Sequence, residues 1–118
     1  MPPKRSGFTR FYFATIYSYR GIKAAFSSEA AVRQEVVAMA ILLPIVFMLE
    51  VTNSERVLLL FSLFVVLITE LLNTAVEKLS DHVSTDMHEL IGKAKDIGSA
   101  AVFISLILVL VTWGIILM

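Results

Sequence analysis

The chain has 118 residues, of which 58% are hydrophobic, and its mean hydropathy of +0.83 places it among membrane proteins with room for one domain of a few helices. It contains no cysteine, which excludes disulfides and thiolate metal sites. Acidic and basic residues balance to a net charge of zero, but six of the ten Lys and Arg precede residue 34, which favours anionic lipid headgroups as neighbours and argues against nucleic acid as a partner.

The first predicted element is an amphipathic helix over residues 8–26. Its apolar residues recur at spacings of three and four, while Arg10 and Arg20 fall on the other side. This pattern is typical of a helix that lies in the membrane interface. A signal peptide is the alternative, but the run FYFATIY is short, and Tyr19, Arg20 and Lys23 follow it where a cleavage segment would be needed.

Two apolar segments follow, and each predicts a transmembrane helix. The first covers about 29–49, but only the fourteen residues 36–49 are free of charge, which is short against the ~20 residues needed to cross a bilayer. We therefore expect the polar residues at its start to belong to the same continuous helix. These residues are Glu29, Arg33, Gln34 and Glu35. A polar turn over 50–56 leads to the second span, at about 57–79.

A polar loop over 80–92 is predicted before the third span, which covers about 95–118. This span has twenty-two consecutive uncharged residues from Ile97 onward, and Trp113 near its far end is typical of an interfacial aromatic belt. The small residues at 98–101 predict close packing against another helix.

The distribution of charge predicts the orientation. The N-terminal segment and the loop before the third span carry most of the Lys and Arg, the 50–56 turn carries only Arg56, and the C-terminus carries none. By the positive-inside rule the N-terminus is cytoplasmic and the C-terminus faces outward. The sequence therefore predicts an all-α, multi-pass membrane protein: an N-terminal surface helix plus three transmembrane helices, in a single domain over 1–118.

Glu70 is the most unusual residue, because it lies in an apolar run where a membrane span should carry no charge. An ionisable group at bilayer depth is costly and usually marks a functional site. Residues at 70, 73, 74 and 77 share one helical face. The predicted stripe is formed by Glu70, Asn73, Thr74 and Glu77, and Asp81 extends it.

Antiparallel spans should bring three polar groups to the cytoplasmic interface at similar depth. These groups are Glu29 with Arg33, Gln34 and Glu35; Glu70 with Asn73 and Glu77; and Lys95 with Asp96. Mg²⁺ prefers oxygen ligands, often one or two carboxylates plus phosphate oxygens. Glu77 and Glu29 suit that role, and Lys95 suits the neutralisation of phosphate charge.

Glu70 lies deeper and drier, which suits a general base for a hydroxyl that arrives from the lipid. The residues alone thus predict a site where a phosphorylated, Mg²⁺-bound ligand meets a lipid. An ordinary helical ion pair between Glu29 and Arg33 is an alternative for that part of the site. A small proton-coupled transporter is an alternative for the whole chain, although Lys95 suits a cation path poorly.

Four stretches carry a resemblance to a known family. They are GFTR (7–10), EAAVRQE (29–35), ELLNTAVEKLSD (70–81) and HELIGKAKDIGSAAV (88–102). In this order and spacing the chain resembles the small integral-membrane diacylglycerol kinases of bacteria. The resemblance implies a homotrimer in the inner membrane that transfers the γ-phosphoryl group of MgATP directly, in line, to diacylglycerol, giving phosphatidate. Undecaprenol kinases share the ELLNTAVE-like stretch and the KD pair, whereas RQE and GSAAV favour the diacylglycerol branch.

The resemblance also implies roles for individual residues. The catalytic pair is Glu70 as general base with Asn73 beside it, and the Mg²⁺ ligands are Glu29 and Glu77. Together with those two ligands, the residues expected at ATP are Arg10, Tyr17, Asp86, Met87, His88, Lys95 and Asp96. Those expected at the lipid substrate are Arg10, Ala31, Val32, Arg33, Gln34, Glu35, Arg56, Glu70, Ser99 and Trp113.

Overall fold

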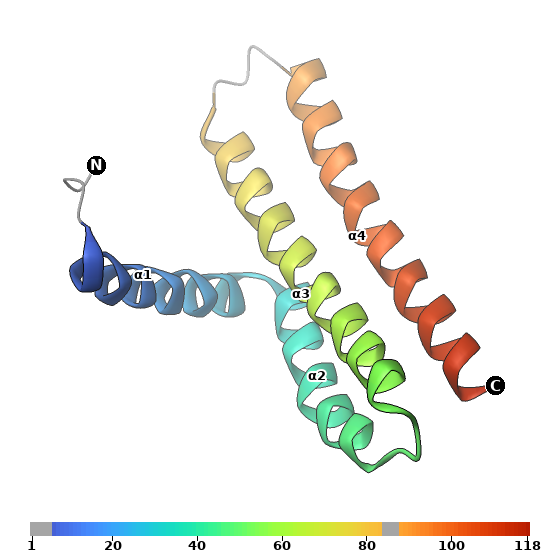
Figure 1. Cartoon of the computed structure of the whole chain (residues 1–118). Coiled ribbons are helices and arrows are strands. Elements are labelled where there is room, and N and C mark those ends of the chain that lie inside the picture. Colours follow the sequence, from blue (N-terminus) through green and yellow to red (C-terminus); the bar gives the residue numbers. More distant parts are fainter. Residues whose placement is uncertain (1–5, 84–87) are drawn as a thin grey trace.

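The structure is a computed structural model that describes residues 6–83 and 88–118 (Figure 1). Those residues form four α-helices: α1 (Gly7–Ser28), α2 (Ala30–Met48), α3 (Asn53–His82) and α4 (His88–Leu117). Helices α2, α3 and α4 are long and apolar enough to cross a membrane. Figure 1 shows α1 projecting sideways from them. The predicted all-α membrane fold, a lateral N-terminal helix followed by three apolar spans, is confirmed.

Helix α3 is the central element, because it packs against each of the other three. The chain is correspondingly flat, with extents of 52 × 41 × 22 Å. A core of buried apolar side chains lies where α2 ends and α3 begins, and it is formed by Met39, Val46, Leu59 and Leu63. Trp113 of α4 packs against this core from the far side of α3. Apolar packing is thus concentrated at the end of the bundle opposite to the carboxylates.

Helix α3 starts earlier than the apolar pattern predicts, inside the 50–56 turn. Thr52 and Glu55 form a capping box: the Thr52 hydroxyl accepts from the Glu55 amide at 3.1 Å, and the Glu55 carboxylate accepts from the Thr52 amide at 2.9 Å. This reciprocal pairing satisfies two backbone donors that a helix start otherwise leaves free. Only residues 49–52 connect α2 to α3.

The prediction of a polar loop over 80–92 is wrong for the part of it that the structure describes. Helix α3 continues to His82, and α4 already begins at His88. Two ion pairs accompany the added turns: Lys95 with Asp81 between the helices at 2.5 Å, and Lys93 with Glu89 along α4 at 3.3 Å. The polar residues here belong to helix ends that extend beyond the apolar spans.

Helices α3 and α4 are joined by polar contacts at several levels. The Trp113 indole donates to the Ser62 hydroxyl at 3.1 Å, and the Thr69 hydroxyl donates to that of Ser105 at 3.0 Å. Such contacts between apolar helices fix their register, because a misaligned pair would leave these groups without partners. The register in turn places the first two turns of α4 beside the acidic end of α3.

Candidate functional site

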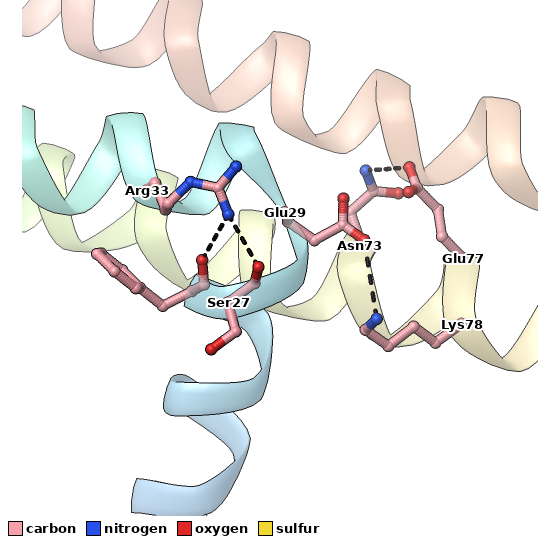
Figure 2. Close-up of polar contacts among 7 residues, drawn as sticks. Ser27, Glu29, Arg33, Asn73, Glu77 and Lys78 are labelled. Atoms are coloured by element: carbon pink, nitrogen blue, oxygen red, sulfur yellow. Dashed lines mark hydrogen bonds and ion pairs between the residues drawn. The ribbon is translucent and has the colours of Figure 1, made fainter.

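Glu29 occupies the break between α1 and α2. Its backbone is extended, with φ −119° and ψ 118°, so the predicted continuous helix through the polar cluster starts one residue later, at Ala30. Arg33 stabilises this break, because its guanidinium donates to the carbonyls of Phe26 (2.9 Å) and Ser27 (3.0 Å) (Figure 2). Arg33 therefore caps the end of α1 rather than forming the helical ion pair with Glu29 that the spacing allows.

The acidic face of α3 lies next to Glu29. Asn73 donates from its amide nitrogen to Oε1 of Glu77 at 3.1 Å (Figure 2). Lys78 reaches the same carboxylate from α3, with its Nζ 3.9 Å from Oε1 of Glu29. Residues from the α1–α2 break and from the last third of α3 are thus brought together.

Glu70 is half-buried one turn below Asn73 on this face. Three other carboxylates lie close enough to repel it electrostatically, namely those of Glu29, Glu35 and Glu77. Four carboxylates gathered near a bilayer are unfavourable unless a cation or a positively charged partner joins them. The arrangement is therefore suited to hold a cation with its ligand.

The carboxylates of this site fit a hard divalent cation on the condition that the cation arrives with a phosphate ligand. In the described part of the chain, no three acidic or histidine side chains lie close enough together to hold a metal ion by themselves. Glu29 and Glu77 supply carboxylate oxygens from two elements, as Mg²⁺ requires, and Mg²⁺ is commonly completed by water and by the phosphates of its ligand. The residues thus fit a cation that arrives with phosphate, not a permanent protein cage.

Lys95 is on α4 beside the acidic face. Its ammonium group is bound to Asp81 at 2.5 Å and also lies within electrostatic reach of Glu77. Asp96, the next residue, is exposed. The two predicted nucleotide contacts on α4 therefore lie at the same end of the bundle as the acidic face of α3. Asp86 and Met87 lie outside the described residues, as does the side chain of His88.

The predicted residues on α1 lie further away. Arg10 is exposed near the start of α1, where it lines a shallow pocket with Phe11 and Ala14. Tyr17 stacks obliquely on Phe13, with ring centres 6.1 Å apart, and the Arg20 guanidinium lies 6.0 Å from its ring centre. Among the described residues α1 contacts α2 and α3 but not α4. The chain by itself therefore does not bring Arg10 or Tyr17 together with Lys95.

The predicted lipid contacts are scattered over the chain. On α2, Ala31 and Gln34 are exposed, whereas the side chain of Val32 is completely buried and has no surface left for a ligand. Ser99 is exposed on α4. An apolar groove of about 390 Å³ runs between α3 and α4 on the same side as Asn73, lined by Thr69, Leu72, Asn73, Val76, Ala94, Ile97, Gly98 and Ala101.

Arg56 and Trp113 lie at the opposite end of the bundle from Glu70. Arg56 and Glu70 are fourteen positions apart, which is about 21 Å along α3. The Arg56 guanidinium donates to the Val46 carbonyl, and to the Val51 carbonyl at 3.3 Å, so it caps the end of α2. Trp113 is bound to Ser62. Both residues contact protein groups far from the acidic site.

Lys78 was not singled out from the sequence as part of the site, and the pairing of Asp81 with Lys95 was not predicted. Lys78 is separated from Glu29 by 49 positions, and Asp81 from Lys95 by 14, so no local spacing signals either contact. Gly98 belongs to the small residues for which close packing was predicted, and the prediction is confirmed there, because Gly98 lies directly against Asn73. Ser99, Ala100 and Ala101 are exposed instead.

The fold and the site define a class: a three-span α-helical membrane protein with a carboxylate-rich site at one end of its bundle. A family model described as prokaryotic diacylglycerol kinase matches residues 16–117. The chain is 45% identical to the diacylglycerol kinase of Escherichia coli (strain K12) over 117 residues, which are 99% of this chain and 96% of that protein. The chain therefore belongs to the prokaryotic diacylglycerol kinase family.

Diacylglycerol kinases of two other bacteria give the same result. The diacylglycerol kinase of Haemophilus influenzae is 46% identical over 111 residues, which are 94% of each chain. That of Helicobacter pylori (strain 26695) is 38% identical over 114 residues, which are 97% of this chain and 89% of that protein. The similarity thus extends over nearly the whole of each protein and includes the site.

Proposed function

We propose that the chain is an ATP-dependent lipid kinase, a single membrane-embedded domain that phosphorylates diacylglycerol to phosphatidate. The observation that carries this proposal is the convergence of Glu29, Glu70 and Glu77 at one end of three apolar helices, in a chain of the diacylglycerol kinase family. A site that is acidic yet close to the hydrocarbon suits a reaction between a cation-bound phosphate ligand and a lipid hydroxyl. The names of the relatives favour diacylglycerol over undecaprenol as that lipid.

The reaction we propose is a direct in-line transfer. The acceptor hydroxyl oxygen forms a bond to the γ-phosphorus of ATP, the bond from that phosphorus to the bridging oxygen breaks, and ADP leaves. Glu70 takes the proton of the hydroxyl. Transfer of this kind requires mainly positioning and neutralisation of charge, so a small scaffold suffices.

Glu29 and Glu77 would hold Mg²⁺, which, when bound with ATP, neutralises charge on the phosphate oxygens. Asn73 orients Glu77 through its 3.1 Å hydrogen bond. Lys95 is a compact positive charge beside Glu77, and we assign it to the phosphates. Lys95 must leave Asp81 to reach them, or share its three N–H groups between the two.

We also propose that the enzyme is a homotrimer with sites shared between protomers. The expected nucleotide contacts Arg10 and Tyr17 are on α1, whereas Lys95 and Asp96 are on α4, a helix that α1 does not contact among the described residues. Large exposed apolar side chains on α4, including Phe103, Leu110 and Ile115, supply a surface for a neighbouring protomer or for lipid. The proposed location is the bacterial inner membrane, with the N-terminus cytoplasmic and the C-terminus periplasmic.

A lipid phosphorylation assay in mixed micelles tests the function. It supplies MgATP with diacylglycerol and undecaprenol in separate reactions, and includes Glu70→Gln. We expect Glu70-dependent formation of phosphatidate with little undecaprenyl phosphate. Phosphorylation of undecaprenol alone would retain the mechanism and overturn the choice of acceptor. Failure of folded protein to phosphorylate either lipid would overturn the kinase proposal and favour the transporter interpretation.

A further inference from the structure

Gly98 differs from every other glycine of the described chain. A Cβ atom added to Gly98 would lie 2.1 Å from Oδ1 of Asn73 and 3.2 Å from its Cγ, well inside the closest approach of real atoms. Cβ atoms added to Gly7, Gly21, Gly92 or Gly114 would meet nothing within 4 Å. Glycine is less favourable than alanine in the interior of a helix. At position 98, unlike positions 92 and 114 of the same helix, the side chain of Asn73 leaves no room for the alanine Cβ.

The Asn73 amide is held between two groups. On one side its oxygen faces the bare backbone of Gly98, and on the other its nitrogen donates to Oε1 of Glu77 at 3.1 Å. The oxygen is buried and has no hydrogen-bond partner among the described residues. A buried unpaired carbonyl is costly, and native proteins retain one chiefly where another requirement fixes the geometry. Here the retained interaction is the hydrogen bond to Glu77.

We propose that Gly98 is a positioning residue for the lipid kinase reaction. Because Gly98 has no side chain, the Asn73 amide can pack with its oxygen against the backbone of α4 and keep its nitrogen on Glu77. The Glu77 carboxylate is thereby held in the orientation in which it binds a divalent cation together with phosphate. This inference rests on the proposed function, and in particular on Glu77 as a metal ligand.

The test compares Gly98→Ala with Gly92→Ala and Gly114→Ala, two substitutions in the same helix that meet open space. Binding of Mn²⁺ with a non-hydrolysable ATP analogue is measured by electron paramagnetic resonance on the purified full-length protein in micelles. Loss of a group that orients a metal ligand typically weakens metal binding by about 10–100-fold. We expect Gly98→Ala to weaken Mn²⁺ binding by about that factor and to raise the apparent KM for Mg²⁺, while the KM for diacylglycerol and the binding by both control variants stay at wild-type values.

A double substitution separates positioning from a general disturbance of α4. In Asn73→Ala the amide is gone, and the Cβ of residue 73 lies 3.9 Å from a Cβ at position 98, an ordinary contact. We therefore expect Asn73→Ala/Gly98→Ala to bind Mn²⁺ as tightly as Asn73→Ala alone. A further loss in the double variant would mean that Gly98 acts independently of Asn73 and would overturn the proposal. This comparison also decides the matter if Gly98→Ala alone does not fold.

The outcomes distinguish this inference from the function on which it rests. If the wild-type protein neither binds Mn²⁺ with nucleotide nor produces phosphatidate, the proposed function is wrong. If the wild type does both and Gly98→Ala binds Mn²⁺ as tightly as Gly92→Ala does, only the positioning role of Gly98 is wrong.

Discussion

The two ends of the three-helix bundle differ in whether their polar groups have partners. At the end where α2 meets α3, Arg56 caps α2, Thr52 and Glu55 cap α3, and Ser62 accepts from Trp113 above a packed apolar core. At the other end, carboxylates repel one another and the Asn73 oxygen is unpaired. One end therefore contributes stability and the other gives up stability for a reactive arrangement, which is the trade-off expected at functional sites.

Glu70→Gln should have the largest effect on activity and a small effect on stability. Removal of a general base typically lowers the rate by about 10²–10⁴-fold. Unfolding should not become easier, because the substitution removes repulsion from Glu29, Glu35 and Glu77. Phosphatidate formation and thermal unfolding in micelles measure the two effects. The matched control is Glu50→Gln, an exposed carboxylate at the opposite end, which should change neither. A Glu70→Gln rate near that of wild type would remove Glu70 from the mechanism.

Ser62→Ala, at the end of the bundle where α2 meets α3, should lower stability and leave activity unchanged. The substitution leaves the Trp113 indole without an acceptor, and an unpaired buried donor costs about 1–3 kcal/mol. We expect a lower unfolding temperature with kcat unchanged below the transition. Adding Trp113→Phe should restore much of the stability, because both partners are then gone. If the double variant is less stable than Ser62→Ala, the hydrogen bond is not the source of the loss.

Thr52→Ala should have a smaller effect of the same kind. The threonine hydroxyl accepts from the Glu55 amide at the start of α3, and loss of such a cap costs about 1 kcal/mol. Chemical denaturation measures the change, and Thr52→Ser, which keeps the hydroxyl, is the control. An equal loss in both variants would assign the effect to the lost methyl group instead of the cap.

Lys78→Met should have the smallest effect on stability. The ion pair with Glu29 has a distance of 3.9 Å and both side chains are partly exposed, so its contribution is within about 1 kcal/mol. Because a positive charge beside a proposed Mg²⁺ ligand disappears, we expect half-maximal activity at a lower Mg²⁺ concentration. Lys93→Met, which breaks the exposed pair with Glu89, is the control and should leave the Mg²⁺ requirement unchanged. An unchanged requirement in Lys78→Met would show that Lys78 does not compete with the cation.

The spans and the acidic face could be predicted from the sequence, because both follow from local periodicity. Uninterrupted apolar runs predict α3 and α4, and the spacing of Glu70, Asn73 and Glu77 places them on one face of a helix. The start of α3 could also have been found, since Thr52 and Glu55 have the capping-box spacing. The polar composition around them suggested a turn instead.

Other features depend on contacts between distant residues and leave no local signal. The stretch EAAVRQE contains good helix formers, yet the backbone is extended at Glu29 because Arg33 caps α1. The close packing of Gly98 could be predicted, but its partner Asn73 could not, because that pairing depends on the register of α3 against α4. The same holds for the contact between Lys78 and Glu29.

The length of α3 sets the height in the membrane at which each carboxylate operates. From its start at Asn53, the helix rises about 26 Å to Glu70 and about 36 Å to Glu77, while the hydrocarbon layer is about 30 Å thick. Glu70 and Glu77 therefore lie about 10 Å apart in height along the helix axis, and Glu77 is the one nearer the polar end of α3. The roles that we propose use this difference in height, because a lipid hydroxyl would meet the deeper carboxylate and a nucleotide the one nearer the water.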